Sequence, residues 1–343
     1  MSVLEVVSVA PGVTVQDQGR PGYLARGLSR SGAADRLALA EGAALVGNAP
    51  DAAAIEMNGI GGAFTAQGSP ILIALTGAPM RADLGGAPLA WNTSHTVAPG
   101  QTLTIGAATA GTYGYLHVAG GIATDPFLGA RSTHMVAGIG GPLSPGQSLP
   151  LGAPSRRTEP GMTLSVENRF QGGVIRVVRS LQTDHFAQAE VGRFANTDFT
   201  RDARANRMGV RLTQAGPGFA AEGGLNVLSE VIVSGDIQIT GDGTPFVLLP
   251  ESQTTGGYPR LATVIPADLP RIAQAPPGAA VRFSFVTLDE AVAAERAYRA
   301  ALAALPGQIH PRLRDPRDIP DLLSYQLIGG VTAGDPDMEG MFP

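Results

Sequence analysis

Two polar, glycine-rich stretches, far apart in the sequence, contain residue types suited to binding a small polar molecule. One is Gln253–Pro259 (QTTGGYP), which lies between two apolar runs, and the other is Thr14–Tyr23 (TVQDQGRPGY). Glycine lets backbone N–H groups approach a ligand closely, and the neighbouring hydroxyl, amide and carboxylate groups supply donors and acceptors. We predict that the two loops contribute to one shared site. The alternative is that each is a tight turn with solvent-facing side chains.

Arginines in or near these loops indicate an anionic or carbonyl-containing ligand. Arg20 could present its planar guanidinium to a carboxylate, a phosphate or a ureido oxygen. Alternatively, it pairs locally with Asp17. Arg207 and Arg211 lie on one face if their segment is an extended strand. Because two neighbouring cations repel each other, we expect an anion between them, which is a substrate, a phosphate or the side chain of Glu230.

Other polar residues are weaker candidates. Ser31 precedes the first convincing helix, at about 34–46, where a helix N-terminus suits an anion or a polarised carbonyl. Glu56 stands in an apolar strand, so it either faces solvent or is buried with a partner. The five histidines lack metal-site spacing, and we expect His117 to be packed. We recognise no Ser-His-Asp arrangement, phosphate-binding loop or dinucleotide-binding fingerprint.

The composition excludes several classes of function. The chain has 343 residues, of which 44% are hydrophobic and 15% charged, and its net charge is −5. It therefore reads as a globular protein without a basic face for nucleic acid. No apolar run approaches the roughly 18 residues of a membrane span, and the N-terminus does not resemble a signal peptide. We expect a cytoplasmic protein.

The missing residue types restrict the chemistry further. The chain has no cysteine, and all 24 basic residues are arginine. These two absences exclude a thiolate nucleophile, a phosphate-loop lysine and a lysine carrying covalent biotin. We therefore expect no covalently bound cofactor and no metal. Any biotin must arrive on another protein.

Short strand candidates separated by glycine or proline dominate the chain. This pattern predicts a mainly β protein with a few short helices, not the alternation of a parallel α/β sheet. We predict an N-terminal β domain over 1–150, a C-terminal β domain with a terminal helix over 151–305, and an extended tail over 306–343. Residues 140–157 are interpreted as the interdomain connection, and 231–239 as a strand. A capping box at Thr287–Glu290 begins the terminal helix.

Six ordered motifs resemble one known family. They are PGxTVQDxGRxGY from Pro11, SGAxD from Ser31, LVGN from Leu45, VAGGI from Val118, NRMGxRL from Asn206 and QTTGGYP from Gln253. The chain is identified by them, over roughly residues 3–290, as a member of the biotin-dependent carboxyltransferase family. That family, also called allophanate hydrolase subunit 2, includes the C-type subunit of 5-oxoprolinase, the Kip-type kinase-inhibitor antagonist and part of urea carboxylase.

The resemblance implies two related cyclophilin-like β-barrel domains and a B-type partner, which is also called allophanate hydrolase subunit 1. It implies chemistry on an amide-like N–C=O group, where charge develops on oxygen. Three positions depart from the usual family pattern, which leaves the particular substrate open. They are Pro142-Leu143, Ala205-Asn206 and Glu251-Ser252.

Three functions are compatible with this resemblance. The first is membership of an ATP-dependent 5-oxoprolinase complex with A-type and B-type partners, converting 5-oxoproline to glutamate. The second is a carboxyltransferase role, in which the chain takes a carboxyl group from carboxybiotin on a separate carrier and gives it to a urea- or amide-like acceptor. The third is a non-catalytic regulator of a kinase-inhibitor partner. We expect Arg207→Ala to abolish activity without affecting folding.

The predicted site combines the two loops with the arginines. The catalytic candidates are Asp17, Arg20, Arg207 and Gln253. The predicted substrate contacts are Gln16, Tyr23, Ser31, Asn206, Arg211, Thr254, Thr255, Gly256, Gly257 and Tyr258.

Overall fold

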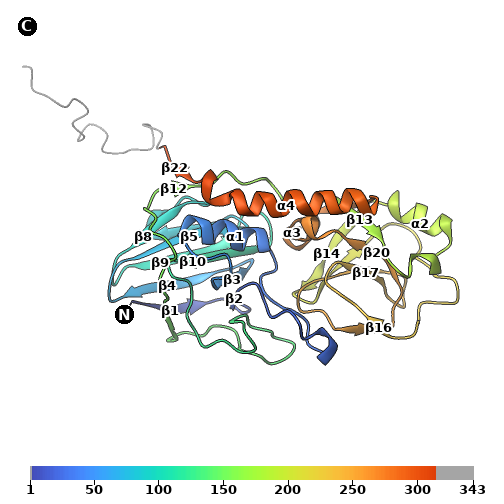
Figure 1. Cartoon of the computed structure of the whole chain (residues 1–343), viewed down its shortest axis with the longest axis horizontal. Coiled ribbons are helices and arrows are strands. Elements are labelled where there is room, and N and C mark those ends of the chain that lie inside the picture. Colours follow the sequence, from blue (N-terminus) through green and yellow to red (C-terminus); the bar gives the residue numbers. More distant parts are fainter. Residues whose placement is uncertain (1, 314–343) are drawn as a thin grey trace, which may run out of the picture.

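The computed structural model describes residues 2–313, and these form a mainly β protein (Figure 1). The first half contains a six-stranded sheet in the order β11-β1-β4-β9-β6-β7. Each neighbouring pair of strands in this sheet is antiparallel, as expected for strands joined by short glycine turns. Its strands are β1 (Val3–Val9), β4 (Gly62–Gln67), β6 (Met80–Leu84), β7 (Ala87–Pro88), β9 (Thr102–Ala108) and β11 (Ser148–Pro150).

A second, five-stranded sheet of the first half has the order β2-β3-β10-β5-β8. Apolar side chains from both sheets, such as Phe64, Ile73 and Leu103, are fully buried in one core. Because both sheets bury one face in it, they form the two layers around that core. The strands are β2 (Thr14–Gln16), β3 (Ala54–Asn58), β5 (Ile71–Gly77), β8 (Ser94–Val97) and β10 (Tyr113–Val118).

The second half contains a closed seven-stranded barrel in the order β13-β20-β17-β18-β15-β14-β21. Phe199 and Phe283, which lie on strands of this barrel, pack ring against ring with Phe194 and Phe219, and the ring centroids of the stacked Phe194 and Phe283 are 4.9 Å apart. The strands are β13 (Gly173–Arg179), β14 (Phe199–Asn206), β15 (Gly209–Thr213), β17 (Asp236–Ile239), β18 (Pro245–Leu248), β20 (Arg260–Val264) and β21 (Ala280–Phe285).

Small elements complete the described chain. Two short pairs lie outside the main sheets: β12 (Met162–Thr163) with β22 (His310–Pro311), and β16 (Glu230–Val231) with β19 (Thr255–Gly256). The helices are α1 (Arg36–Leu45), α2 (Gln188–Ala195), α3 (Leu269–Gln274) and α4 (Leu288–Gln308), with 3₁₀ turns η1 (Leu24–Arg26), η2 (Thr183–His185) and η3 (Pro266–Asp268).

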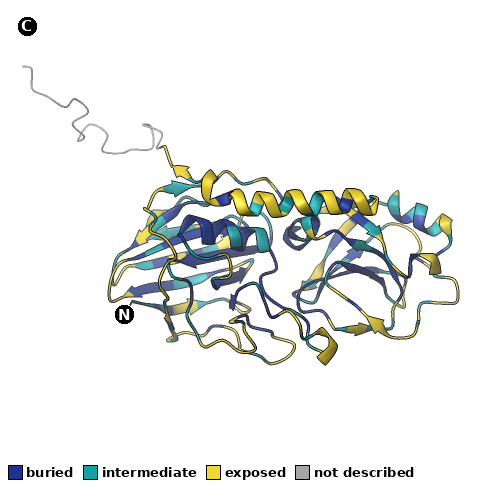
Figure 2. Cartoon of the chain, viewed as in Figure 1, coloured by how far each residue is buried: buried dark blue, intermediate teal, exposed yellow. Residues whose placement is uncertain are grey.

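Helix α4 runs along both halves of the molecule and contacts α1, η3 and β13 (Figure 1). It begins at the predicted capping box: Thr287 Oγ1 accepts a hydrogen bond from the Glu290 N–H, and the Glu290 carboxylate accepts one from the Thr287 N–H. Most of its surface is exposed, whereas the strands beneath it are buried (Figure 2). It therefore lies on the surface and packs across both halves of the molecule.

The mainly β prediction is confirmed. Of the two predicted barrels, the second half forms a closed one, whereas the first half is built from two sheets. Two local predictions are wrong. Residues 140–157 are not simply a connection, because β11 pairs with β1. The predicted strand 231–239 is interrupted between β16 and β17, where Gly235 has a φ of +100°. The crossing to the barrel comes after Leu164, which still bonds to Asn92, so we propose 165–172 as the connection. The predicted apolar patch at 322–328 lies outside the described residues.

Replacing Gly42 of α1 by alanine is predicted to destabilise the protein, although alanine is the better helix former. A Cβ at this position would lie 2.0 Å from the ring of His117, which is buried in β10 and bonded to Thr76. Overpacking of this kind costs about 1–3 kcal/mol, so Gly42→Ala should lower the midpoint of thermal unfolding. Gly192→Ala in α2 is the matched control, because nothing lies within 4 Å of its Cβ position and alanine favours a helix. Equal stabilisation by both changes would contradict the packing.

Candidate functional site

A buried polar cluster lies where the two halves meet, and Arg207 is at its centre. Arg207, in the turn between β14 and β15, forms salt bridges with Glu56 of β3 and with Glu251, the latter at 2.6 Å. Its guanidinium also donates to the Gly32 carbonyl oxygen. Glu56 accepts further hydrogen bonds from the Ala34 N–H at 2.8 Å and the Tyr115 hydroxyl at 2.6 Å. Each charge in this cluster therefore has its partners within the chain.

The buried carboxylates around Arg207 determine its pKa. Burial alone lowers the pKa of a guanidinium, but the attraction of Glu56 and Glu251 outweighs burial here and raises the pKa of Arg207. The same cluster raises the pKa of Tyr115, through burial and the charge of Glu56. Of the two alternatives that the sequence left open for Glu56, the structure shows the buried side chain with a partner. Arg207 joins the two halves of the molecule.

The first polar loop is held against residues 130–134. The Asp17 carboxylate accepts hydrogen bonds from the Gly19 N–H at 2.8 Å, the Arg131 N–H at 2.6 Å and the Ser132 hydroxyl. Gln16 donates to the Thr133 carbonyl oxygen at 3.1 Å, and Ser31 donates to the same oxygen at 2.8 Å. Asp17 and Gln16 therefore shape the loop from within the fold.

Arg20 does not form the local ion pair with Asp17 that was the alternative prediction. Its guanidinium donates to the carbonyl oxygens of Ser132 and, at 3.4 Å, of Phe127. Arg20 is only 1% exposed, so water does not reach its Nη1, and this buried atom has no hydrogen-bond partner among the described residues. Burial lowers the pKa of Arg20 despite the charges of Asp17 and Glu251. It is a desolvated cation without a salt bridge among the described residues.

The second polar loop lines a cavity of about 230 Å³ on the barrel. Gln253 and Tyr258 are exposed there, and Asn206 faces the same space from the end of β14. Gln238 of β17 contributes a further amide. Thr255 and Gly256 belong to the backbone pairing of β19 with β16, and the carbonyl oxygens of Thr254 and Gly257 accept hydrogen bonds from the Ile232 and Val227 N–H groups. The lining residues are Asn206, Met208, Ile232, Gln238, Thr240, Phe246, Leu248, Ser252, Gln253 and Tyr258.

The first loop lines a neighbouring cavity of about 350 Å³, to which Arg20 and Tyr23 belong. The two cavities share Ile232 and Ser252 in their walls. A hydrogen bond near the two loops also joins the two halves, because the Ser31 N–H donates to the Pro250 carbonyl oxygen at 3.0 Å. The structure thus brings the two polar loops to adjoining cavities, which is the geometry that a shared site requires.

The prediction that an anion lies between Arg207 and Arg211 is wrong. Arg211 forms salt bridges with Asp202 at 2.7 Å and Asp242 at 3.4 Å, on the outside of the barrel. Glu230 pairs instead with Arg260 at 2.6 Å. The strand periodicity failed because Arg207 belongs to a turn, so its side chain leaves the face on which Arg211 lies. Neither arginine needs a bound anion for charge balance.

Sequence reasoning missed a Ser-His-Glu arrangement beside this cluster. His134 Nε2 lies 2.9 Å from the Ser29 hydroxyl, and His134 Nδ1 lies 3.9 Å from Glu251. However, Nδ1 accepts a hydrogen bond from the Ala137 N–H at 3.3 Å. Nε2 then carries the proton and donates to Ser29, so His134 cannot act as its base. Burial also lowers the pKa of His134. We assign the arrangement a packing role.

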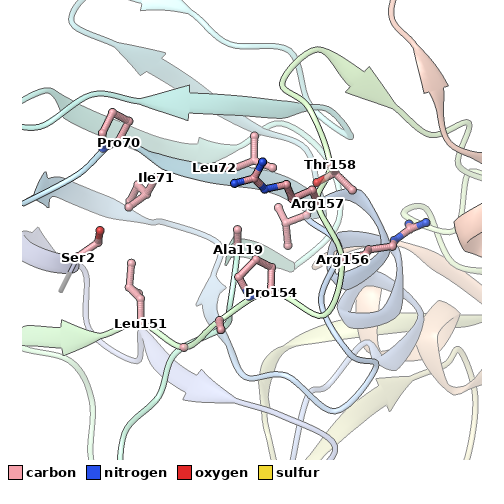
Figure 3. A pocket seen from close by; sticks show the side chains of 13 residues that line it. Ser2, Pro70, Ile71, Leu72, Ala119, Leu151, Pro154, Arg156, Arg157 and Thr158 are labelled. Carbon is pink, nitrogen blue, oxygen red and sulfur yellow. The ribbon is translucent and has the colours of Figure 1, made fainter.

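A larger cavity, of about 620 Å³, lies away from both loops on the first half (Figure 3). Apolar side chains such as Ile71, Leu72 and Leu151 form much of its wall. Arg156 points away from it and donates to the Ala44 carbonyl oxygen at 3.0 Å. The predicted polar residues do not contribute to this wall, so cavity size and candidate chemistry disagree. We place the candidate site by the chemistry.

Two kinds of feature are absent from the part of the chain that the structure describes. The described residues contain no group of three or more histidine, aspartate or glutamate side chains arranged to hold a metal ion. Within the same part of the chain, no helix combines the length and the apolar character needed to cross a membrane.

Comparison with known proteins identifies the family. Residues 26–285 match the family described as "Carboxyltransferase domain, subdomain A and B". The chain is 32% identical to the C-type subunit of 5-oxoprolinase from Escherichia coli over 312 residues, which cover 90% of this chain and 99% of that protein. It is 33% identical to the same 5-oxoprolinase component of Haemophilus influenzae, over 86% of this chain and 94% of the relative.

A solved structure shows the same architecture. The crystal structure of the Kluyveromyces lactis urea carboxylase superposes with a TM-score of 0.80 at 25% identity, over 92% of this chain and 31% of that one. The chain therefore corresponds to about a third of that longer protein. The chain belongs to the carboxyltransferase domain family, as its motifs predicted.

Proposed function

We propose that this chain is the C-type subunit of an ATP-dependent 5-oxoprolinase complex, which opens 5-oxoproline to glutamate. The observation that carries the proposal is the 32% identity to the C-type 5-oxoprolinase component of Escherichia coli, over 99% of that relative's length. The match to the urea amidolyase of Lachancea kluyveri is weaker, at 29% identity over 18% of its length.

The adjoining cavities supply chemistry that suits a lactam. Ring opening breaks the C–N bond of the amide as water adds to the carbonyl carbon, and negative charge develops on the carbonyl oxygen. Asn206, Gln238 and Gln253 present amides that pair with an N–C=O group. Arg20 adds positive charge at the neighbouring cavity. We propose these residues, with Tyr258, as the substrate-binding surface.

The remaining predictions belong to the same proposal. We propose that ATP is used by an A-type partner, that a B-type partner completes the active unit, and that the complex works in the cytoplasm. The relatives are named as one lettered component of 5-oxoprolinase, which supports the existence of other components. The domain boundary at 305 and the regulator hypothesis remain predictions, and the connection proposed at 165–172 would move the boundary predicted at 150.

Reconstitution tests this function directly. The chain, combined with its A-type and B-type partners, should release glutamate from 5-oxoproline only when ATP is present. The chain alone should release none and hydrolyse no ATP, because the site would be incomplete. Glutamate release is measured by a coupled dehydrogenase assay. Lack of release by an assembled complex would contradict the proposal, and turnover by the chain alone would contradict the need for partners.

A second candidate function rests on the description of the matching family as a carboxyltransferase domain. In that case a biotin carried by another protein would bring the carboxyl group to the adjoining cavities. An assembled complex that fails to release glutamate but transfers labelled carboxylate from carboxybiotin to a urea- or amide-like acceptor would establish this alternative.

A further inference from the structure

The cavity beside the first loop is lined by three arginines. They are Arg20, Arg30 and Arg36, which come from the loop, from the segment after η1 and from the first residue of α1. No aspartate or glutamate is among the described residues that line it. The other lining residues are Pro21, Gly22, Tyr23, Leu24, Leu28, Ser29, Ile232, Val233, Ser234, Pro250, Ser252, Pro266 and Leu269.

None of these three arginines forms a salt bridge with a described carboxylate, in contrast to Arg207 and Arg211. Arg30 donates to the Gln18 carbonyl oxygen at 2.8 Å, and Arg20 likewise uses carbonyl oxygens. Carbonyl oxygens satisfy hydrogen-bond donors but carry no net charge, so charge compensation comes only from carboxylates beyond salt-bridge distance: Asp17 and Glu251 for Arg20, Asp17 for Arg30, and Glu295 for Arg36. The buried Nη1 of Arg20 has no partner among the described residues.

The charged form of each of the three arginines is disfavoured by its surroundings. Burial lowers the pKa of Arg20 and of Arg30. Burial, together with repulsion by Arg30, lowers the pKa of Arg36 to about 10, although the charge of Glu295 opposes this shift. Partly desolvated cations such as Arg30 and Arg36, which repel each other, cost free energy unless an anion lies between them. An anion bound in this cavity would attract these cations and offset the repulsion between them.

The rest of the wall limits the kind of anion. Leu24, Leu28, Ile232, Val233 and Leu269 give the cavity an apolar lining around the charges. A volume of about 350 Å³ lies within the range of small-molecule sites. These features fit a small organic anion with a carbon body better than a fully hydrated ion.

We propose that Arg30 and Arg36, with Arg20 behind them, bind the anionic group of the substrate and select an anionic amide over a neutral one. This inference rests on the proposed function, which makes that group the carboxylate of 5-oxoproline. A single five-membered ring bears both the carboxylate and the lactam. We therefore place the ring where the two cavities adjoin, at Ser252 and Ile232.

Equilibrium binding to the full-length chain tests this assignment. Isothermal titration at low ionic strength compares 5-oxoproline with 2-pyrrolidinone, which is the same lactam without the carboxylate. The unmodified chain should bind 5-oxoproline roughly tenfold or more tightly than 2-pyrrolidinone, because a charge-assisted bond to a guanidinium is lost in the latter. Arg30→Gln and Arg36→Gln should each remove most of this preference.

Arg26→Gln is the matched control. Arg26 is exposed in η1, on the same segment, and does not line the cavity. This variant loses the same charge, so it should keep the preference for 5-oxoproline. Unchanged thermal unfolding midpoints in Arg30→Gln and Arg36→Gln would show that the effect is not a loss of folding.

The outcomes separate this inference from the proposed function. If the complex releases no glutamate but the chain binds inorganic phosphate, with the affinity reduced roughly tenfold in Arg36→Gln, the anion cavity stands and the oxoprolinase function fails. The cavity assignment is overturned by equal binding of the two lactams, by unchanged binding in both variants, or by no saturable binding of either 5-oxoproline or phosphate.

Discussion

Arg207→Ala is expected to destabilise the protein by about 3–5 kcal/mol, the usual effect of removing one partner from a buried ion pair. The change would leave Glu56 and Glu251, which are 2% and 1% exposed, without their shared cation. This replaces the expectation from sequence that Arg207→Ala would abolish activity in an intact fold. The measurement is denaturant-induced unfolding, followed by circular dichroism.

Arg211→Ala provides the control for this prediction. Arg211 also forms two salt bridges, but with Asp202 and the exposed Asp242 at the barrel surface. Ion pairs at the surface contribute only about 0–1 kcal/mol, and the partly buried Asp202 keeps its salt bridge to Arg204, so this variant should unfold close to the unmodified protein. If Arg207→Ala costs no more than Arg211→Ala, the central role of Arg207 in the buried cluster is refuted.

The contrast between these two arginines shows where sequence reasoning stops. Both belong to one short motif, and a period of two placed them together. The turn at 207–208 separates them, and the partners of Arg207 are 151 and 44 residues away in the chain. Local spacing cannot report such contacts. The pairing of Glu56 could only be stated as one of two alternatives.

The fold was more accessible to sequence reasoning, because it depends on local signals. Alternating apolar residues between glycine turns predicted the strands, and the Thr287–Glu290 capping box marked the start of α4 correctly. The failures were local too. Gly235, with positive φ, interrupts the strand predicted over 231–239. The pairing of β11 with β1 was also missed, because no residue pattern in 148–150 indicates a strand.

The candidate site was predicted in part. The two glycine-rich loops reach adjoining cavities. Arg30 and Arg36 were overlooked, because nothing in their immediate sequence distinguishes them from surface arginines. A signal did exist: four arginines, including the exposed Arg26, occur within 17 residues of sequence, from Arg20 to Arg36, and Asp35 next to the last of them forms a salt bridge with Arg169.

Arg169→Met is expected to cost about 3–5 kcal/mol as well, and here the loss should depend on pH. Arg169 comes from the connection to the barrel and forms salt bridges with Asp35 at 2.8 Å and with Glu41 at 2.7 Å, all three being buried. Asp35 would retain bonds from the Ala38 N–H and the Gln274 amide. Glu41 would lose both of its bonds to Arg169.

The direction of the pH effect follows from Glu41. Burial raises its pKa in the folded protein even though Arg169 opposes this shift. Without Arg169, the raising influences of burial and Asp35 remain, so the pKa of Glu41 rises further. A carboxyl group with a raised pKa binds more protons in the folded than in the unfolded state, so stability falls as pH rises through this range. The variant should therefore be weakest at about pH 8 and recover towards about pH 5.

Thermal unfolding at these two pH values measures the effect, and a double variant supplies the control. Arg169→Met with Glu41→Leu replaces the buried ion pair by apolar side chains, which is often neutral or stabilising. The double variant should recover much of the lost stability at the higher pH and show little pH dependence from this site. If Arg169→Met were equally weak at both pH values, or if the double variant were weaker still, the uncompensated charge of Glu41 would not be the cause. Recovery would show that the connection is held to α1 by charge balance.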